Sequence, residues 1–144
     1  MSCNKKVSLI IINYNYSLYL ENVVDSALSQ TYNNIEVIVV DDGSTDDSLG
    51  ILKKYNDKIK LLVQENSGMV EASNNGFINS SGDIIFFLDA DDYLKNTAVE
   101  EVIKSWSDEI VKVHFRLEKR DDHNKYLGTV PPIEKKLCEG DVWS

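Results

Sequence analysis

The sequence has few cysteines and no long apolar run, and both absences narrow the class of protein. Its two cysteines, Cys3 and Cys138, lie at opposite ends of the 144 residues, which indicates free thiols in a reducing compartment rather than a disulfide framework. No apolar stretch approaches the roughly 18 residues of a membrane-spanning helix. The strand-like run from Val7 to Ile12 is too short for the core of a signal peptide. We therefore expect a cytoplasmic protein without a transmembrane segment.

Positive charge is also scarce, because 15 lysines and arginines stand against 24 acidic residues and give a net charge of −9. This excess of negative charge argues against nucleic acid or anionic lipid as the main partner. The chain also lacks the glycine-rich motifs GxxxxGK[ST] and GxGxxG, whose backbone amides bind phosphate. A bound phosphate group would therefore need a local cation, most simply a metal ion.

What is present is a regular alternation of strand and helix patterns in a chain long enough for one domain with a core. Hydrophobic residues make up 42% and charged residues 27%, as in globular proteins. The alternation predicts an α/β fold with a mostly parallel sheet and helices on both faces. The predicted strands cover residues 7–12, 35–40, 59–63 and 84–88, and the helices begin near Ser17, Ser44, Val70 and Thr97. Capping boxes are expected for Ser44 with Asp47 and for Thr97 with Glu100.

The pattern changes near residue 108, where apolar and charged residues begin to alternate. Val111, Val113, Phe115 and Leu117 are separated by charged residues and a histidine, as in a strand with one wet face. We therefore expect an antiparallel edge strand after residue 110 and a short return strand over residues 125–127. The expected organisation is one domain, with a core over 1–107 and a smaller region over 108–144.

Polar residues follow every predicted strand of the core. In an open parallel sheet, ligands bind beyond the carboxyl ends of the strands. If the extended geometry persists past Leu88, Asp89 and Asp91 at the end of the fourth strand point to one side, because side chains alternate along a strand. Two carboxylates this close repel each other unless a cation lies between them or one is protonated. They predict a divalent metal site with oxygen ligands, although a solvated loop or a helix N-cap is an equally ordinary explanation.

Two further strand ends offer groups that could bind a nucleobase. Asp42, after the second strand, can accept a hydrogen bond from an N–H group of a base edge. Tyr14, after the first strand, could stack on a base, although a tyrosine of the core or surface is about as expected.

Four segments resemble family 2 glycosyltransferases with the GT-A fold: VSLIIINYN (residues 7–15), SQTY (29–32), EVIVVDDGSTDD (36–47) and GDIIFFLDADD (82–92). The resemblance covers roughly residues 5–107 and implies a Rossmann-like fold, a nucleotide-diphospho-sugar donor, often a UDP-sugar, and Mg²⁺ or Mn²⁺. It implies that Asp89 and Asp91, as a DxD motif, serve the metal and the diphosphate. The nucleotide-binding residues that it implies are Ile12, Tyr14, Asp42, Asn74 and Ala90.

Two departures from the family pattern concern the donor and the chemistry. The family usually has Ala-Arg-Asn in the third helix, whereas this chain has Ala72, Ser73 and Asn74, so one positive contact to the donor is missing. The family's catalytic base is a carboxylate well beyond the DxD motif, in the acceptor-binding half. Asp141, the last aspartate, does not resemble that motif, so the catalytic residue is unknown.

We interpret the chain as the donor-binding part of an inverting sugar transferase for polysaccharide or glycoconjugate biosynthesis. Its acceptor would be a sugar or a lipid-linked sugar, and a region beyond these residues could associate with a membrane surface. The main alternative is a catalytically incomplete domain that binds a nucleotide or acts as a scaffold, which the missing arginine and base favour. A phosphoryl-transfer domain is disfavoured, because the acidic pair follows the fourth strand and no partner lysine is evident.

Overall fold

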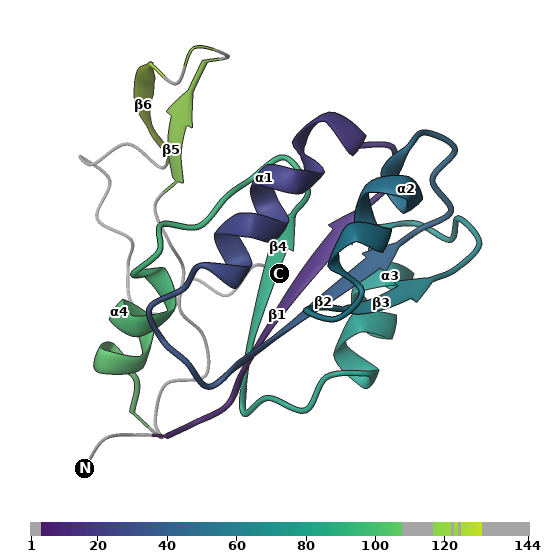
Figure 1. The fold of residues 1–144 in the computed structure, drawn as a ribbon. Coiled ribbons are helices and arrows are strands. Elements are labelled where there is room, and N and C mark those ends of the chain that lie inside the picture. The colour runs from purple at the N-terminus through teal and green to yellow at the C-terminus, as the bar shows by residue number, and fades with distance from the viewer. Residues whose placement is uncertain (1–3, 108–116, 122, 124, 131–144) are drawn as a thin grey trace. The chain divides into compact units, whose positions relative to one another are not determined.

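The structure, a computed structural model, describes residues 4–107, 117–121, 123 and 125–130. Its elements separate into two units, residues 1–106 and residues 107–144, which we describe in turn. In chain order the first unit contains β1 (Val7–Asn13), α1 (Ser17–Leu28), β2 (Ile35–Asp41), α2 (Ser48–Leu52), the 3-10 helix η1 (Lys53–Tyr55), β3 (Lys60–Val63), α3 (Met69–Ile78), β4 (Ile84–Asp89) and α4 (Ala98–Ser105) (Figure 1).

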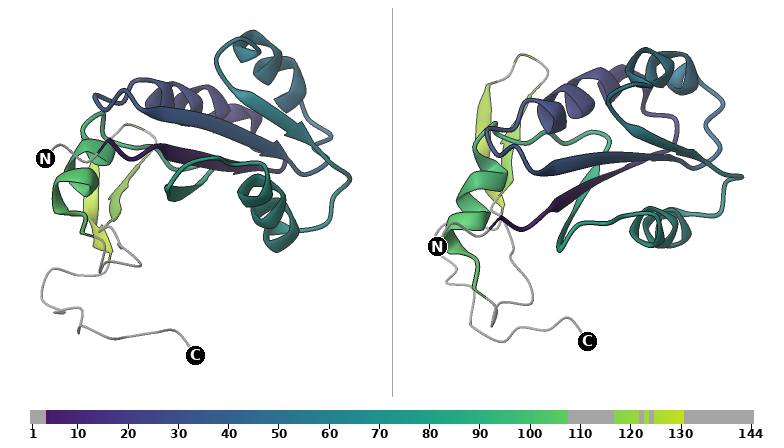
Figure 2. Two further views of the ribbon diagram at one scale, coloured as in Figure 1. Left: turned by 90° about the horizontal axis from the view of Figure 1, so that it is seen from below. Right: turned by 60° about the horizontal axis from the view of Figure 1, so that its bottom comes forward.

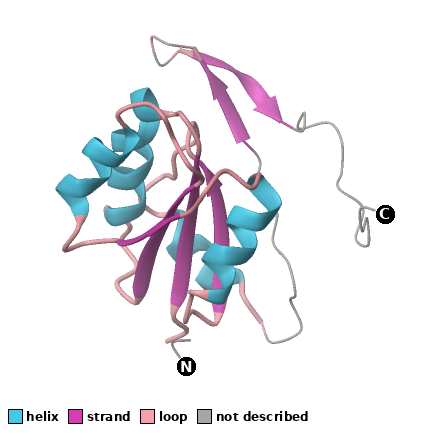
Figure 3. Ribbon diagram, turned by 90° about the vertical axis from the view of Figure 1, so that its right-hand side faces the viewer, coloured by secondary structure: helices cyan, strands magenta, loops and turns pink. Residues whose placement is uncertain are grey.

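The strands of the first unit form one parallel sheet in the order β3-β2-β1-β4. The strands β1 and β2 consist mostly of buried β-branched and leucine side chains, as expected for strands covered on both faces. α1 and α2 cover one face and α3 covers the other (Figure 2), and helices are visible on both sides of the strands in Figure 3. The predicted mixed α/β fold, with a mostly parallel sheet, is therefore confirmed.

The register of the sheet decides which side chains meet at its carboxyl edge. Ile12 of β1 pairs with Val40 of β2 on one side and with Asp89 of β4 on the other. The three strands therefore end at nearly the same height, and their terminal residues share one edge.

α3 packs on the sheet through its small residues rather than its large ones. Ala72 and Gly76 are its buried residues, and a Cβ added to Gly76 would lie 2.5 Å from the Cγ2 atom of Ile10. Val70 and Phe77, which helical spacing places on one side of α3, are 71% and 57% exposed. The absence of side-chain bulk at Gly76 thus allows the helix to lie close to β1.

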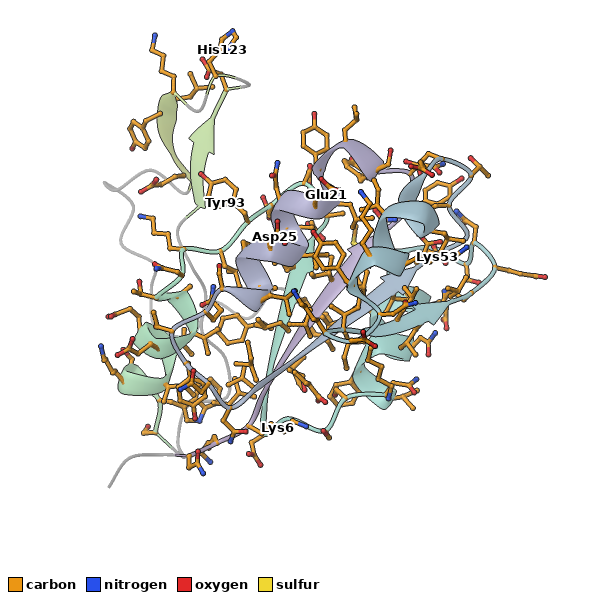
Figure 4. The ribbon with its side chains drawn as sticks, viewed as in Figure 1. Lys6, Glu21, Asp25, Lys53, Tyr93 and His123 are labelled. Atoms are coloured by element: carbon orange, nitrogen blue, oxygen red, sulfur yellow. The ribbon has the colours of Figure 1, made fainter. Side chains whose placement is uncertain are left out.

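A polar cluster joins the opposite, amino-terminal end of the sheet. The Glu36 carboxylate of β2 accepts hydrogen bonds from the Ser8 hydroxyl and the Ser81 backbone N–H, and pairs with the Lys6 ammonium at 3.0 Å. Lys6 lies just before β1 (Figure 4). Burial opposes ionisation, but the hydrogen bonds from Ser8, Ser81 and Lys6 outweigh it and lower the pKa of Glu36 from 4.5 to about 2. The charged form of Glu36 therefore connects β1, β2 and the segment before β4.

The lowered pKa of Glu36 predicts acid-sensitive stability. A carboxylate whose pKa falls on folding stabilises the native state above its unfolded-state pKa, and this contribution disappears as the pH falls. The Glu36→Gln variant should lose about 1–3 kcal/mol of unfolding free energy at neutral pH. The difference between wild type and variant should shrink as the pH falls from 4.5 toward about 2. Urea unfolding at several pH values measures it, and a pH-independent difference would contradict the assignment.

The second unit contains a described antiparallel hairpin, β5 (Leu117–Arg120) with β6 (Tyr126–Val130). The pairing is irregular between Lys119 and Arg120. The return strand is thus found over 126–130 rather than 125–127. Of the edge strand predicted from Val111 to Leu117, the structure describes only Leu117, where β5 begins, and residues 111–116 lie outside the described residues. Among the residues that the structure describes, no helix is long and apolar enough to cross a membrane.

Candidate functional site

A cleft of about 440 Å³ opens at the carboxyl ends of β1, β2 and β4, beside the start of α3. The structure brings several residues singled out from the sequence into its lining, from three different strand ends. The lining residues are Ile12, Tyr14, Tyr16, Asp42, Asn66, Gly68, Met69, Asp89, Ala90 and Asp91. Asn74 is exposed on α3 and is not among them, so its role in binding stays a prediction.

Asp42 is almost completely buried, with 3% of its surface exposed, and its carboxylate organises the loop between β3 and α3. Its Oδ1 atom accepts hydrogen bonds from the Gln64 side chain at 2.7 Å and from the Ser67 backbone N–H at 2.9 Å. Its Oδ2 atom accepts one from the Gly68 backbone N–H at 2.8 Å. Asp42 therefore both lines the cleft and fixes one of its walls.

The residue after Asp42 allows that loop to approach the sheet. Gly43 has a positive φ of 76°, and a Cβ added to it would lie 2.7 Å from the backbone nitrogen of Asn66. A larger residue at position 43 would be strained and would displace the loop. Asn66 and the start of α3 consequently lie over the end of β2, where they line the cleft.

The tyrosines of the cleft lie on the loop between β1 and α1, which is fastened to the loop after β2. Asn15 has a positive φ of 59°, a conformation that asparagine tolerates better than most residues. Its side-chain oxygen accepts a hydrogen bond from the Thr45 backbone N–H at 2.7 Å, while its own N–H donates to the Ser44 hydroxyl. These contacts fix the backbone between Tyr14 and Tyr16.

Negative charge dominates the cleft. Its lining includes the carboxylates of Asp42, Asp89 and Asp91, and none of the lining residues is a lysine, arginine or histidine. Burial, together with the charges of Asp91 and Asp89, raises the pKa of the neighbouring Asp92. Such crowding of like charges is relieved by a cation.

The carboxylate oxygens of the cleft suit a divalent metal ion that is bound jointly by the protein and a ligand. The described residues contain no cluster of three or more acidic, histidine or cysteine side chains arranged to hold a metal alone. Mg²⁺, however, commonly binds through one or two carboxylates together with substrate phosphates and water. Asp89 and Asp91 can supply such a pair.

The cleft also contains four residues to which no motif of the sequence assigns a role, namely Tyr16, Asn66, Gly68 and Met69. Asn66 and Gly68 belong to the polar stretch after β3. The rule that ligands bind beyond the carboxyl ends of parallel strands could therefore have predicted both residues. Met69 begins α3, and its place in the cleft depends on how that helix is rotated. Periodicity alone does not give that rotation.

Comparisons with known proteins agree with this fold. The chain is 37% identical to an uncharacterized glycosyltransferase of Nostoc sp. (strain PCC 7120), over 93% of this chain and 43% of that protein. The structure resembles S. aureus TarS 1–349 in complex with UDP, with a TM-score of 0.63 and 32% identity over 69% of this chain and 31% of the other. It also resembles the mannosyltransferase PcManGT from Pyrobaculum calidifontis in complex with GDP-Man and Mn²⁺, with a TM-score of 0.54 and 27% identity over 60% of this chain and 28% of the other.

The chain thus spans less than half the length of the Nostoc relative that it matches. The family model of glycosyl transferase family 2 matches residues 8–139, which is most of the sequence. The chain therefore belongs to glycosyl transferase family 2.

Proposed function

We propose that the cleft binds a nucleotide-diphospho-sugar, with a UDP-sugar as the first candidate, together with Mg²⁺ or Mn²⁺. One observation carries the proposal: Asp42 and Tyr14, which suit a nucleobase, share a cleft with Asp89 and Asp91, and no cationic side chain lines it. A diphosphate would otherwise meet only negative charge there. The complexes of TarS with UDP-GlcNAc and of the Pyrobaculum mannosyltransferase with GDP-Man and Mn²⁺ support this class of ligand.

In this proposal each residue has a distinct task. Asp42 accepts an N–H group of the base, Tyr14 lies against the ring, and Ile12 and Ala90 border the nucleoside. Asp89 and Asp91 hold the divalent ion and, through it, the diphosphate. When bound, that ion would neutralise charge on the diphosphate leaving group, an effect worth several kcal/mol.

We further propose that the domain serves an inverting transfer to a hydroxyl group of a sugar or lipid-linked acceptor. Such a transfer needs a base within about 2.6–3.2 Å of the attacking hydroxyl. In the described part of the chain, the carboxylates that line the cleft are Asp42, Asp89 and Asp91, all of which already have tasks. The base is therefore expected from residues other than these, and a donor-binding domain without turnover remains the alternative.

Thermal unfolding tests the proposal directly. UDP with Mn²⁺ should raise the melting temperature by about 5–10 °C at 100 times the Kd, since a ligand of the native state stabilises it by mass action. UDP with EDTA, and Mn²⁺ without nucleotide, should each give a much smaller shift. An equal shift in EDTA would contradict the metal assignment, and no shift under any of these conditions would contradict nucleotide binding.

A further inference from the structure

We propose that Gln64 and Asn75 are positioning residues, which orient the Asp42 carboxylate so that it recognises a nucleobase bearing a ring N–H group. The inference rests on the proposed function and extends it to base selection. Neither residue lines the cleft, so both would act through Asp42 rather than by touching the donor.

A relay of three side-chain amides, those of Asn79, Asn75 and Gln64, leads from the end of α3 to Asp42. The Asn79 amide nitrogen donates to Asn75 Oδ1 at 2.9 Å. The Asn75 amide nitrogen donates to Gln64 Oε1 at 2.7 Å, and the Gln64 amide nitrogen donates to Asp42 Oδ1 at 2.7 Å. Because each amide accepts through oxygen and donates through nitrogen, the orientation of one determines the orientation of the next.

This orientation determines how much of the Asp42 carboxylate remains available. Each carboxylate oxygen can accept about two hydrogen bonds. Oδ1 accepts N–H groups from Gln64 and Ser67, whereas Oδ2 accepts only that of Gly68 among the described residues. One acceptor position is therefore left, on Oδ2, and the carboxylate is fixed from two directions.

A single acceptor position in a buried setting discriminates between bases by their hydrogen-bonding edge. Uracil and guanine present a ring N–H group that can donate to it. Cytosine and adenine present a ring nitrogen with a lone pair at the corresponding place, so that two acceptors would face each other. Leaving a buried acceptor without a donor costs free energy. The site therefore weakens binding of the wrong base more than it strengthens binding of the right one. The relay therefore favours uridine or guanosine donors over cytidine or adenosine donors.

The test uses Gln64→Met, which keeps the side-chain length but removes the amide, and Asn75→Ala, which leaves Gln64 in place but releases its orientation. Calorimetry in Mn²⁺ compares UDP, CDP and inorganic pyrophosphate. Both variants should bind UDP about tenfold more weakly and discriminate less between UDP and CDP. Their affinity for pyrophosphate should not change, because this ligand has no base.

A double variant tests whether Asn75 acts through Gln64. In the Gln64→Met background, Asn75→Ala should cause little further loss, because coupled residues are not additive. The control is Asn22→Ala, which removes an exposed amide from α1 and should leave all three affinities unchanged. Melting temperatures of each variant confirm that it is folded.

The outcomes are distinguishable. If wild type binds UDP and both single variants bind it equally well, the relay is refuted while the proposed function stands. Equal losses for UDP and pyrophosphate would show a general structural role and would also refute it. If wild type itself fails to bind UDP with Mn²⁺, the proposed function fails and the relay falls with it.

Discussion

Replacement of Asp91 by asparagine should abolish the Mn²⁺-dependent binding of UDP. The substitution removes one of the two carboxylates expected to hold the ion, in a cleft lined by no lysine or arginine among the described residues. Little would then offset the repulsion between the diphosphate and the remaining acids. We expect affinity to fall about 100-fold or more, since even residues that only support metal ligands cost about 10–100-fold. Calorimetric titration with UDP at fixed Mn²⁺ measures the loss.

The matched control for this experiment is Asp57→Asn, which makes the same change of charge at an exposed turn that does not line the cleft. It should bind UDP as wild type does. Retention of full affinity by Asp91→Asn would remove Asp91 from the metal site and would redirect attention to Asp89 and Asp92.

Replacement of Asp42 by alanine should weaken both nucleotide binding and the fold. The variant loses the proposed acceptor for the base and leaves three donors, on Gln64, Ser67 and Gly68, without their partner. We expect UDP affinity to fall about tenfold or more and the unfolding free energy to fall by about 2 kcal/mol or more. Calorimetry and urea unfolding measure the two effects separately.

Two further variants accompany Asp42→Ala, one as a control and one with an expected intermediate effect. Asp57→Ala should change neither quantity, whereas Asp42→Asn should be intermediate, because its oxygen can still accept while its nitrogen faces backbone donors. Unchanged UDP affinity in Asp42→Ala, with the stability loss present, would limit Asp42 to a structural role in the loop of residues 64–68.

The order of strands and helices could be predicted because each buried strand of this chain is a short apolar run bounded by polar residues. The meeting of Tyr14, Asp42, Asp89 and Asp91 followed from the same information, since parallel strands end at one edge. These predictions needed only chain order and the rule that side chains alternate. They did not need the orientation of any helix.

Three helices begin within one residue of the predicted positions, whereas the start of α2, the capping contacts and the helix rotations depended on contacts that a local pattern does not contain. Ser44 was expected to cap a helix, but its hydroxyl accepts from Asn13 and Asn15, and α2 begins at Ser48. The predicted capping box of Thr97 is also absent: Thr97 makes no capping hydrogen bond through its side chain. Glu100 accepts instead from Thr31, which lies elsewhere in the chain.

The third helix shows the same limit at the candidate site. The family pattern pointed to Asn74, which is exposed, whereas the adjacent Asn75 is connected to Asp42 through Gln64. Adjacent residues of a helix point about 100° apart, so Asn74 and Asn75 have different surroundings. The role of Asn74 in donor binding stays a prediction. What fixed the rotation of α3 was the close approach at Gly76, a long-range contact.

The place of β1 in the sheet has a consequence for the length of the ligand. β1 lies between β2, which leads to Asp42, and β4, which ends at Asp89, and it is hydrogen-bonded to both along nearly its whole length. The two halves of the proposed donor site therefore cannot slide past each other. The sheet fixes the distance between Asp42 and the acidic pair. A nucleoside monophosphate at the proposed base position would have one phosphate fewer with which to reach the acidic pair, so we expect the site to bind a nucleoside diphosphate more tightly than a monophosphate.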